Sequence, residues 1–130
     1  MVSIGSAPRR VLIVDDCQDT VTVLSLLLKR TGNEVHVAYE GPEAIKTAEE
    51  IQPDIILLDI TLPTMNGYDV ARNVRSQPWG RDINLIALTG WDLEKDHDRA
   101  TDAGFNLHLL KPVNISALEK VFAELPAVAI

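Results

Sequence analysis

The sequence predicts a doubly wound α/β domain, in which helices cover both faces of one parallel sheet. Two observations and one rule of chain connection lead to this fold class. Short apolar runs alternate with amphipathic stretches five times along the 130 residues. Most of these runs are continuously apolar, which is typical of strands buried on both faces of a parallel sheet. Parallel strands need crossover connections, which are right-handed, so the intervening helices pack on both sides of the sheet.

The first apolar run, Arg10–Val14, is too short for a helix and rich in β-branched residues, so it is predicted to be a buried strand. The stretch from about Asp19 to Arg30 has helical spacing, and Gly32 follows it as a helix C-terminus favours. Glu34–Ala38 alternates between polar and apolar residues, which predicts a half-exposed edge strand. The expected core face of the first helix comprises Val21, Leu24 and Leu28, widened by Val23, Leu26 and Leu27.

The second helix is expected to open at Gly41-Pro42, because proline is favoured in a first helical turn. A second buried strand follows at Ile55–Leu58, and Asn66-Gly67 breaks the chain before a short third helix. The apolar positions of these two helices are Ala44, Ile45, Ala48 and Ile51, and then Val70, Ala71 and Val74.

A polar loop at Gln77–Asp82 leads to a further buried strand at Ile83–Leu88. The fourth helix, at about Asp92–Ala103, is mostly polar, and Leu107–Leu110 is the fifth strand. Asn114 is suited to cap the last helix. The apolar face of that helix is Ile115, Leu118, Val121, Phe122 and Leu125.

Composition narrows the class of protein. The chain has 46% hydrophobic residues and a length that suits one domain, expected to span residues 1–130 with a core at about 10–125. Twelve basic and 19 acidic residues give a net charge of −7, which argues against nucleic acid or an anionic membrane as partner. The single cysteine, Cys17, excludes a disulfide scaffold and fits a reducing compartment. No apolar run approaches the roughly 20 residues that span a bilayer, and the first ten residues lack an apolar signal core. A cytoplasmic protein is therefore expected.

Polar residues stand at the carboxyl ends of four predicted strands. Asp15-Asp16 follows the first strand, Asp59 the third, Thr89 the fourth and Lys111-Pro112 the fifth. Ligands of doubly wound sheets bind at the carboxyl ends of the strands. These residues are therefore expected to form one site.

The chemistry of this set points to phosphoryl transfer. Three crowded carboxylates repel one another, and a divalent cation relieves that repulsion. Oxygen ligands with only a few from protein favour Mg²⁺, with Mn²⁺ as the alternative. Lys111 supplies a positive charge and Thr89 a hydroxyl donor, both suited to a phosphoryl oxygen. Together they indicate a phosphoryl group accepted by a carboxylate.

These motifs, with Pro63 and Gly67 behind Asp59, resemble the response-regulator receiver domain of two-component signalling. The resemblance covers about Arg10 to Leu125 and implies a flavodoxin-like strand order of 2-1-3-4-5. It implies that Asp59 is the phosphoacceptor. It also implies that Asp15 and Asp16 hold Mg²⁺ together with Asp59 and the backbone carbonyl of Thr61.

The resemblance also implies that Thr89 is the switch hydroxyl that moves onto the phosphoryl group and that Lys111 is the charge partner of that group. It implies as well that the bond before Pro112 is cis. Receivers usually carry Tyr or Phe three residues before this lysine, as a switch side chain. This chain departs from that pattern with His108, which is expected to act there as a switch coupled to Thr89. Trp91 and Pro112 are expected at the rim of the site, where the indole would shield an aspartyl phosphate from water.

The implied function is a receiver that takes a phosphoryl group from a sensor histidine kinase or a histidine phosphotransfer protein. It would catalyse only its own phosphorylation and dephosphorylation. The expected output surface comprises the fourth helix, the fifth strand and the fifth helix. No output domain is visible after the fifth helix, so the chain is expected to be a stand-alone receiver or one receiver of a larger protein.

Three other functions are alternatives to this one. An aspartate-based phosphatase of the haloacid dehalogenase type has a second Asp two residues after its nucleophile, whereas Asp15 and Asp16 are adjacent. A flavin-binding flavodoxin needs a Ser/Thr/Gly-rich phosphate loop after the first strand, where this chain has DDCQDT. A receiver-like interaction module that is never phosphorylated remains open on sequence alone.

Overall fold

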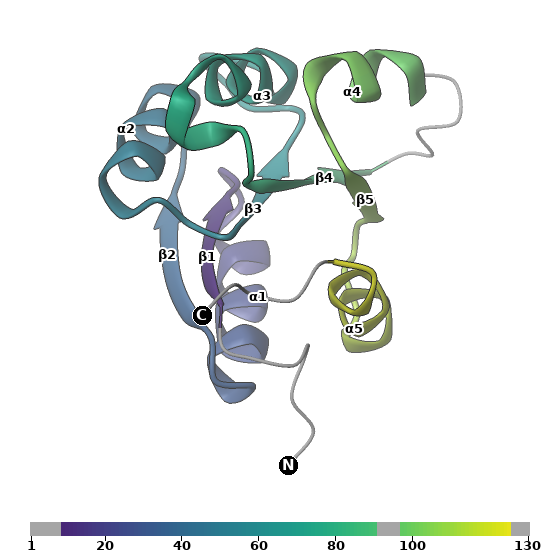
Figure 1. The fold of residues 1–130 in the computed structure, drawn as a ribbon. Coiled ribbons are helices and arrows are strands. Elements are labelled where there is room, and N and C mark those ends of the chain that lie inside the picture. The colour runs from purple at the N-terminus through teal and green to yellow at the C-terminus, as the bar shows by residue number, and fades with distance from the viewer. Residues whose placement is uncertain (1–8, 91–96, 126–130) are drawn as a thin grey trace.

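The computed structural model describes residues 9–90 and 97–125. Its centre is a five-stranded parallel sheet of order β2-β1-β3-β4-β5 (Figure 1). The strands are β1 (Arg10–Val14), β2 (Glu34–Ala38), β3 (Ile55–Asp59), β4 (Asn84–Thr89) and β5 (Leu107–Leu110). The predicted fold class and strand order are confirmed.

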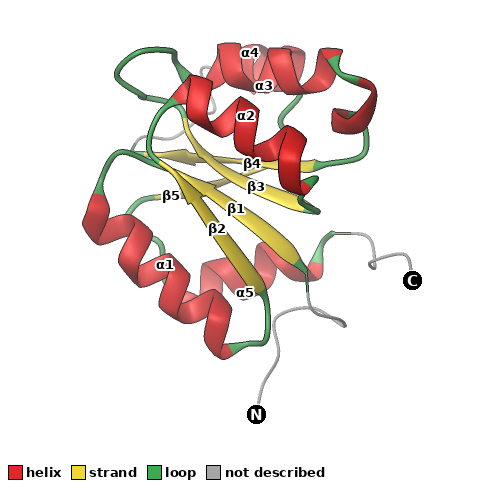
Figure 2. Ribbon diagram, turned by 90° about the vertical axis from the view of Figure 1, so that its left-hand side faces the viewer, coloured by secondary structure: helices red, strands yellow, loops and turns green. Residues whose placement is uncertain are grey.

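Helices cover both faces of this sheet, as Figure 2 shows. One face carries α1 (Gln18–Arg30) and α5 (Ile115–Ala123); the other carries α2 (Gly41–Ile51), α3 (Gly67–Ser76) and α4 (His97–Ala103). A single 3-10 turn, η1 (Pro78–Gly80), lies in the loop expected at 77–82. No helix in the described part of the chain is long and apolar enough to cross a membrane.

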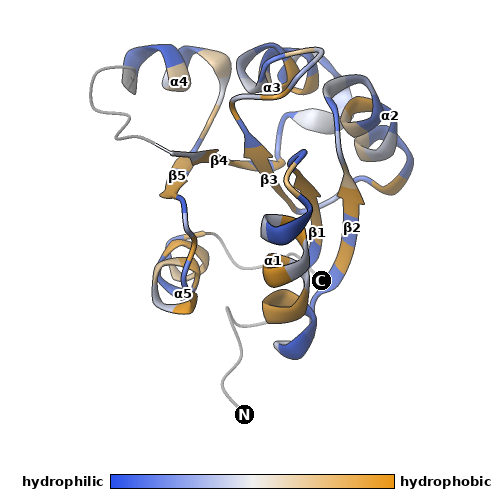
Figure 3. Cartoon of the chain, turned by 180° about the vertical axis from the view of Figure 1, so that it is seen from behind, coloured by the Kyte–Doolittle hydropathy of each residue, from blue (hydrophilic) through white to orange (hydrophobic). Residues whose placement is uncertain are grey.

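The core lies on both sides of the sheet because side chains alternate along each strand. In β3, Ile55 and Leu57 pack toward α1 and α5, whereas Ile56 and Leu58 pack toward α2 and α3. All four are almost fully buried, which explains why β3 is continuously apolar up to its last residue, Asp59, and is drawn orange before its end in Figure 3. The edge strand β2 is only half-buried, as its alternating sequence predicted.

Two predicted core faces are narrower than expected. Val21, Leu24 and Leu28 of α1 are buried, but Val23 and Leu26 are 50% and 55% exposed. The expectation that these two join the core was wrong, because a sheet covers only one arc of a helix that is apolar over a wider one. Ile115 is also exposed, since it is the first residue of α5.

Two asparagine caps fix helices that flank the strand ends. Asn66 Oδ1 accepts a hydrogen bond from Asp69 N at 3.0 Å, and Asn114 Oδ1 accepts one from Ala117 N at 2.8 Å. The predicted cap at Asn114 is thereby confirmed. These caps start α3 and α5 beyond the loops that follow β3 and β5, which leaves the carboxyl edge of the sheet uncovered by those helices.

Candidate functional site

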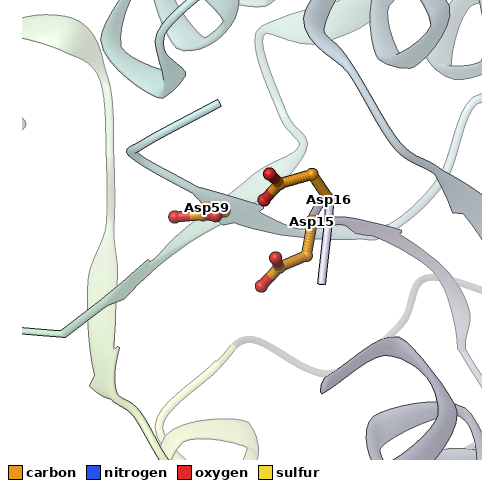
Figure 4. A group of neighbouring side chains, drawn as sticks. All are labelled: Asp15, Asp16 and Asp59. Atoms are coloured by element: carbon orange, nitrogen blue, oxygen red, sulfur yellow. The ribbon is translucent and has the colours of Figure 1, made fainter. Parts of the chain in front are cut away.

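The strand register brings the polar strand ends to one level. Val14 pairs with Leu58, so Asp15 and Asp59 are the next residues on neighbouring strands. Asp59 pairs in turn with Leu88, the residue before Thr89. Asp15, Asp16 and Asp59 therefore gather at the carboxyl edge of the sheet (Figure 4).

Asp59 is a buried carboxylate with two different sides. Asp59 is the last residue of β3, and its side chain is only 3% exposed. Oδ1 accepts hydrogen bonds from Thr61 N at 3.0 Å and from Thr61 Oγ1 at 3.1 Å. Oδ2 lies 3.4 Å from Lys111 Nζ. One carboxylate oxygen is thus held by the β3–α3 loop, while the other faces the ammonium group of Lys111.

Asp15 is fully buried beside the same ammonium group of Lys111. Its Oδ1 accepts a hydrogen bond from Cys17 N at 2.9 Å, and its Oδ2 lies 2.7 Å from Lys111 Nζ. Burial raises the pKa of Asp15, and the neighbouring charge of Asp59 raises it further, against the opposing effects of Lys111 and Cys17 N. Ionising this carboxyl group is therefore costly unless positive charge stays close.

Lys111 supplies part of that charge. Burial alone would lower the pKa of its ammonium group, but Asp15 and Asp59 together outweigh burial, and the pKa is raised. The backbone also positions this residue, since Lys111 N donates to Thr89 O at 2.8 Å. The peptide bond from Lys111 to Pro112 is cis, as the resemblance implied.

The three aspartates fit a divalent cation. One carboxylate oxygen from each of Asp15, Asp16 and Asp59 lies within 4.8 Å of the others. Asp16 is exposed, so water reaches the site to complete the coordination of a hard cation. Mg²⁺ would be held by these carboxylates. The Thr61 backbone carbonyl as a further ligand stays a prediction.

The remaining predicted residues differ in their placement. Thr89 ends β4 and is 1% exposed. His108 is exposed on the edge strand β5, where it lines a groove of about 500 Å³ between β5 and α5. Pro112 is exposed beside Lys111, and Trp91 lies outside the described residues. The switch role of Thr89 and His108 and the rim role of Pro112 and Trp91 stay predictions.

Sequence reasoning missed two positioning contacts around Asp59. The first is the pair of hydrogen bonds from Thr61, for which only the two-residue spacing gave a signal. The second is the close approach of Gly67, where a Cβ atom would lie 2.5 Å from Asp59 O and 2.6 Å from Ile60 Cα. Gly67 N also donates to Ile60 O at 2.8 Å. A glycine at the start of α3 therefore shapes the backbone of Asp59.

Gly67→Ala is expected to destabilise the fold by about 1–3 kcal/mol, because the added methyl group meets backbone atoms that cannot rotate away. Urea denaturation of the metal-free protein measures this loss. Gly90→Ala is the matched control, since a Cβ atom there meets nothing within 4 Å among the residues that the structure describes. Equal unfolding free energies for the two variants would contradict the proposed close packing at Asp59.

Comparison with known proteins agrees with this site. A family model described as "Response regulator receiver domain" matches residues 11–123. An uncharacterised 14.6 kDa protein of Leptolyngbya boryana is 36% identical over 104 residues, 80% of this chain and 79% of that protein. The response regulator PleD of Caulobacter vibrioides is 35% identical over 105 residues, which are 81% of this chain but only 23% of PleD.

Two solved structures share the fold closely. Vibrio cholerae chemotaxis protein CheY4 has a TM-score of 0.84 and 30% identity, covering 88% of this chain and 96% of that one. The receiver domain of the Pseudomonas aeruginosa sensor histidine kinase PA1611 has a TM-score of 0.81 and 34% identity, covering 89% and 95%. That structure holds a magnesium ion coordinated in its active site cleft. The family match and the shared architecture show that this chain belongs to the response regulator receiver domains of two-component signalling.

Proposed function

We propose that Asp59 accepts a phosphoryl group from a phosphohistidine of a sensor histidine kinase or a histidine phosphotransfer protein, in a reaction that requires Mg²⁺. The observation that carries this proposal is the environment of Asp59. Its buried carboxylate is held at one oxygen by Thr61 and faces Lys111 at the other, beside a pocket of two further carboxylates. This arrangement supplies a positioned nucleophile and the charge that compensates a phosphoryl group.

In the proposed transfer, an oxygen of Asp59 forms the bond to phosphorus while the N–P bond of the phosphohistidine breaks. The departing imidazole takes up a proton from water. Bound Mg²⁺ supplies charge neutralisation for the phosphoryl oxygens and the carboxylates. Lys111 exchanges its contact with Asp59 for one with a phosphoryl oxygen, and the Thr89 hydroxyl donates to another. The bonds from Thr61 hold Asp59 in line during the attack.

The phosphoryl group stays on the protein, so the domain serves as a signal carrier and not as an enzyme acting on external substrates. The switch pair Thr89 and His108 would pass the change to the face formed by α4, β5 and α5. The register supports this pairing, because Lys111 N is bonded to Thr89 O and His108 lies opposite Ala87, two residues before Thr89.

The direct test measures the intact mass after incubation with Mg²⁺ and acetyl phosphate. The proposal expects a gain of one phosphoryl group, which hydroxylamine removes and EDTA prevents. An unchanged mass, with binding of partners intact, would instead indicate an interaction module that is never phosphorylated. Continuous hydrolysis of general phosphate esters would indicate a phosphatase.

A surface beside the site supports a protein donor. Val23 and Leu24 of α1, with Pro112 and Val113 of the β5–α5 loop, line a groove of about 190 Å³. Asp19 and Thr20 complete it at the start of α1, close to the acidic pocket. The exposed side chains of Val23 and Leu26 make this face apolar, and the buried core of a protein interface is more apolar than its rim. We propose that the donor protein docks here.

Val23→Asp is therefore expected to slow phosphoryl transfer from a phosphorylated histidine kinase by about tenfold, because a charge replaces an apolar contact. Labelling by acetyl phosphate should be unaffected. Thr22→Asp places the same charge one residue away, outside the groove, and serves as the control. Rates of radiolabel transfer decide the outcome. Equal slowing with both donors, or with both variants, would contradict docking at this groove.

A further inference from the structure

Asn66 and Gly67, where the β3–α3 loop meets α3, form a chemically labile pair. The backbone nitrogen that follows an asparagine can attack the side-chain carbonyl carbon, and glycine has no side chain to hinder that attack. Among the six asparagines of the chain, only Asn66 precedes a glycine. The other five precede larger residues, which are Glu34, Val74, Leu85, Leu107 and Ile115. Asn66 is therefore the asparagine of this chain whose deamidation is least hindered by its neighbour.

Deamidation of this pair needs no reagent other than water. The nitrogen of Gly67 forms a bond to Cγ of Asn66, and the bond from Cγ to the side-chain nitrogen breaks. The proton of the Gly67 nitrogen leaves with that group as ammonia. Water then opens the resulting succinimide ring at one of its two carbonyl carbons. Opening at one carbon gives aspartate, and opening at the other gives isoaspartate, in which the main chain runs through Cβ of residue 66.

The fold keeps both reacting groups of this pair engaged elsewhere. Gly67 N donates its proton to Ile60 O at 2.8 Å, so the attacking nitrogen is held in the backbone. Asn66 Oδ1 accepts from Asp69 N at 3.0 Å, which directs the side chain toward the first turn of α3 as its cap. The main-chain oxygen of Asn66 accepts from Val70 N at 3.2 Å. Ring closure requires the first two of these hydrogen bonds to break, so the start of α3 has to open.

Packing on both sides of Asn66 opposes such an opening. On one side, a Cβ atom at Gly67 would lie 2.5 Å from Asp59 O, so this glycine lies directly against the backbone of the proposed acceptor. On the other side, Met65 is half-buried against the core, and a Cβ atom at Gly41 would lie 2.6 Å from Met65 Cβ. Opening the start of α3 therefore costs contacts with both β3 and the first residue of α2.

We propose that Asn66 is a deamidation site whose rate is set by opening of the start of α3, and that its isoaspartate product is a poor phosphoryl acceptor. Only the second half of this inference rests on the proposed function. Asn66 is partly exposed, so water reaches the succinimide once the ring has formed. The opening that frees Gly67 N is the slow step, and the packing of the β3–α3 loop controls it.

The two products of deamidation have different effects on the site. Aspartate caps a helix as well as asparagine does, so the aspartate product keeps the hydrogen bond from Asp69 N. Isoaspartate adds one atom to the main chain before Gly67 and replaces the capping side chain. The space around Gly67 has no room for that displacement, because the glycine already lies against Asp59 O and Ile60 Cα. The isoaspartate product therefore disturbs the backbone that positions Asp59.

The first test follows deamidation of the full chain at Asn66 by peptide mass mapping, in buffer and in guanidinium chloride. The unfolded parent should deamidate about a hundredfold faster than the native parent, because opening no longer limits the reaction. Met65→Ala should accelerate the native reaction by about tenfold, because it removes the packing against Gly41, and should leave the unfolded rate unchanged.

Thr64→Ala is the matched control, since Thr64 is exposed in the same loop, and this variant should deamidate like the parent in both solvents. Equal rates in the native and the unfolded parent would overturn the protection by the fold. Equal native rates for Met65→Ala and Thr64→Ala would overturn the control of the reaction by loop packing.

The second test compares the two products as acceptors from acetyl phosphate in the presence of Mg²⁺. The isoaspartate form is isolated from aged protein by ion exchange, and Asn66→Asp supplies the aspartate form directly. Asn66→Asp should be labelled like the parent, and the isoaspartate form about tenfold more slowly, because its acceptor is misplaced. Equal labelling of the two forms would overturn the second half of the proposal. If the parent itself is not labelled, the proposed function fails, and the deamidation rates still decide whether opening of α3 controls the reaction at Asn66.

Discussion

Asp59→Asn is expected to abolish formation of the acyl phosphate while leaving the fold intact. An amide has no oxygen nucleophile comparable to a carboxylate, so the bond to phosphorus cannot form. The change is nearly isosteric, and the amide oxygen can still accept the two hydrogen bonds from Thr61. The loss should therefore be complete, whereas unfolding by urea should change little. Intact mass after incubation with Mg²⁺ and acetyl phosphate measures the loss of the acyl phosphate. Circular dichroism during urea denaturation measures the stability of the fold.

Two variants make this result specific to Asp59. Asp69→Asn removes an exposed carboxylate of α3 that pairs with Arg72, and it should label like the parent. Asp15→Asn keeps Asp59 but weakens the ion pair with Lys111 and removes one charge from the metal pocket, so it should slow labelling without eliminating it. A hydroxylamine-labile phosphoryl group on Asp59→Asn, formed at the parent's rate, would show that another residue is the acceptor.

Most of the fold could be predicted because the buried strands are recognisable in the sequence as continuous apolar runs. Ile55–Leu58 is continuously apolar since both faces of β3 are covered, and the structure extends this strand only by Asp59. Predicting the strands also predicted the site, because the carboxyl ends of parallel strands share one edge. Asp15 and Asp59 meet there although 44 residues apart in sequence numbering, since β1 and β3 are neighbours in the sheet.

The features that escaped prediction depend on how far neighbouring elements reach. Helical spacing could not show that the sheet covers Val21 and Leu24 and leaves Val23 exposed, because the width of the covered arc depends on how the helix lies on the sheet. The contacts of Arg75, at the end of α3, could not be predicted either. They are hydrogen bonds to the backbone carbonyls of Ile83 and Gly104, and residue identity does not show where a carbonyl group points.

Metal binding should depend on Asp16 more than on Asp15. The carboxylate of Asp15 is engaged on both sides, by Cys17 N at 2.9 Å and by Lys111 Nζ at 2.7 Å, whereas Asp16 is exposed at the same pocket. An oxygen that already contacts an ammonium group is a weaker ligand for a second cation. The difference in engagement therefore assigns direct contact with Mg²⁺ mainly to Asp16.

Asp16→Ala is accordingly expected to weaken Mg²⁺ binding by roughly 10- to 100-fold, and Asp15→Ala by less. Titration calorimetry, or quenching of intrinsic fluorescence, at neutral pH measures the Mg²⁺ affinity of each variant. The same substitution removes a like charge beside Asp15 and Asp59, so the metal-free Asp16→Ala protein should unfold at a higher temperature than the metal-free parent. Mg²⁺ should then stabilise the parent more than the variant, since only the parent binds it tightly. Equal affinities in the two variants would refute the assignment, because they would mean that the engaged and the exposed carboxylate contribute alike.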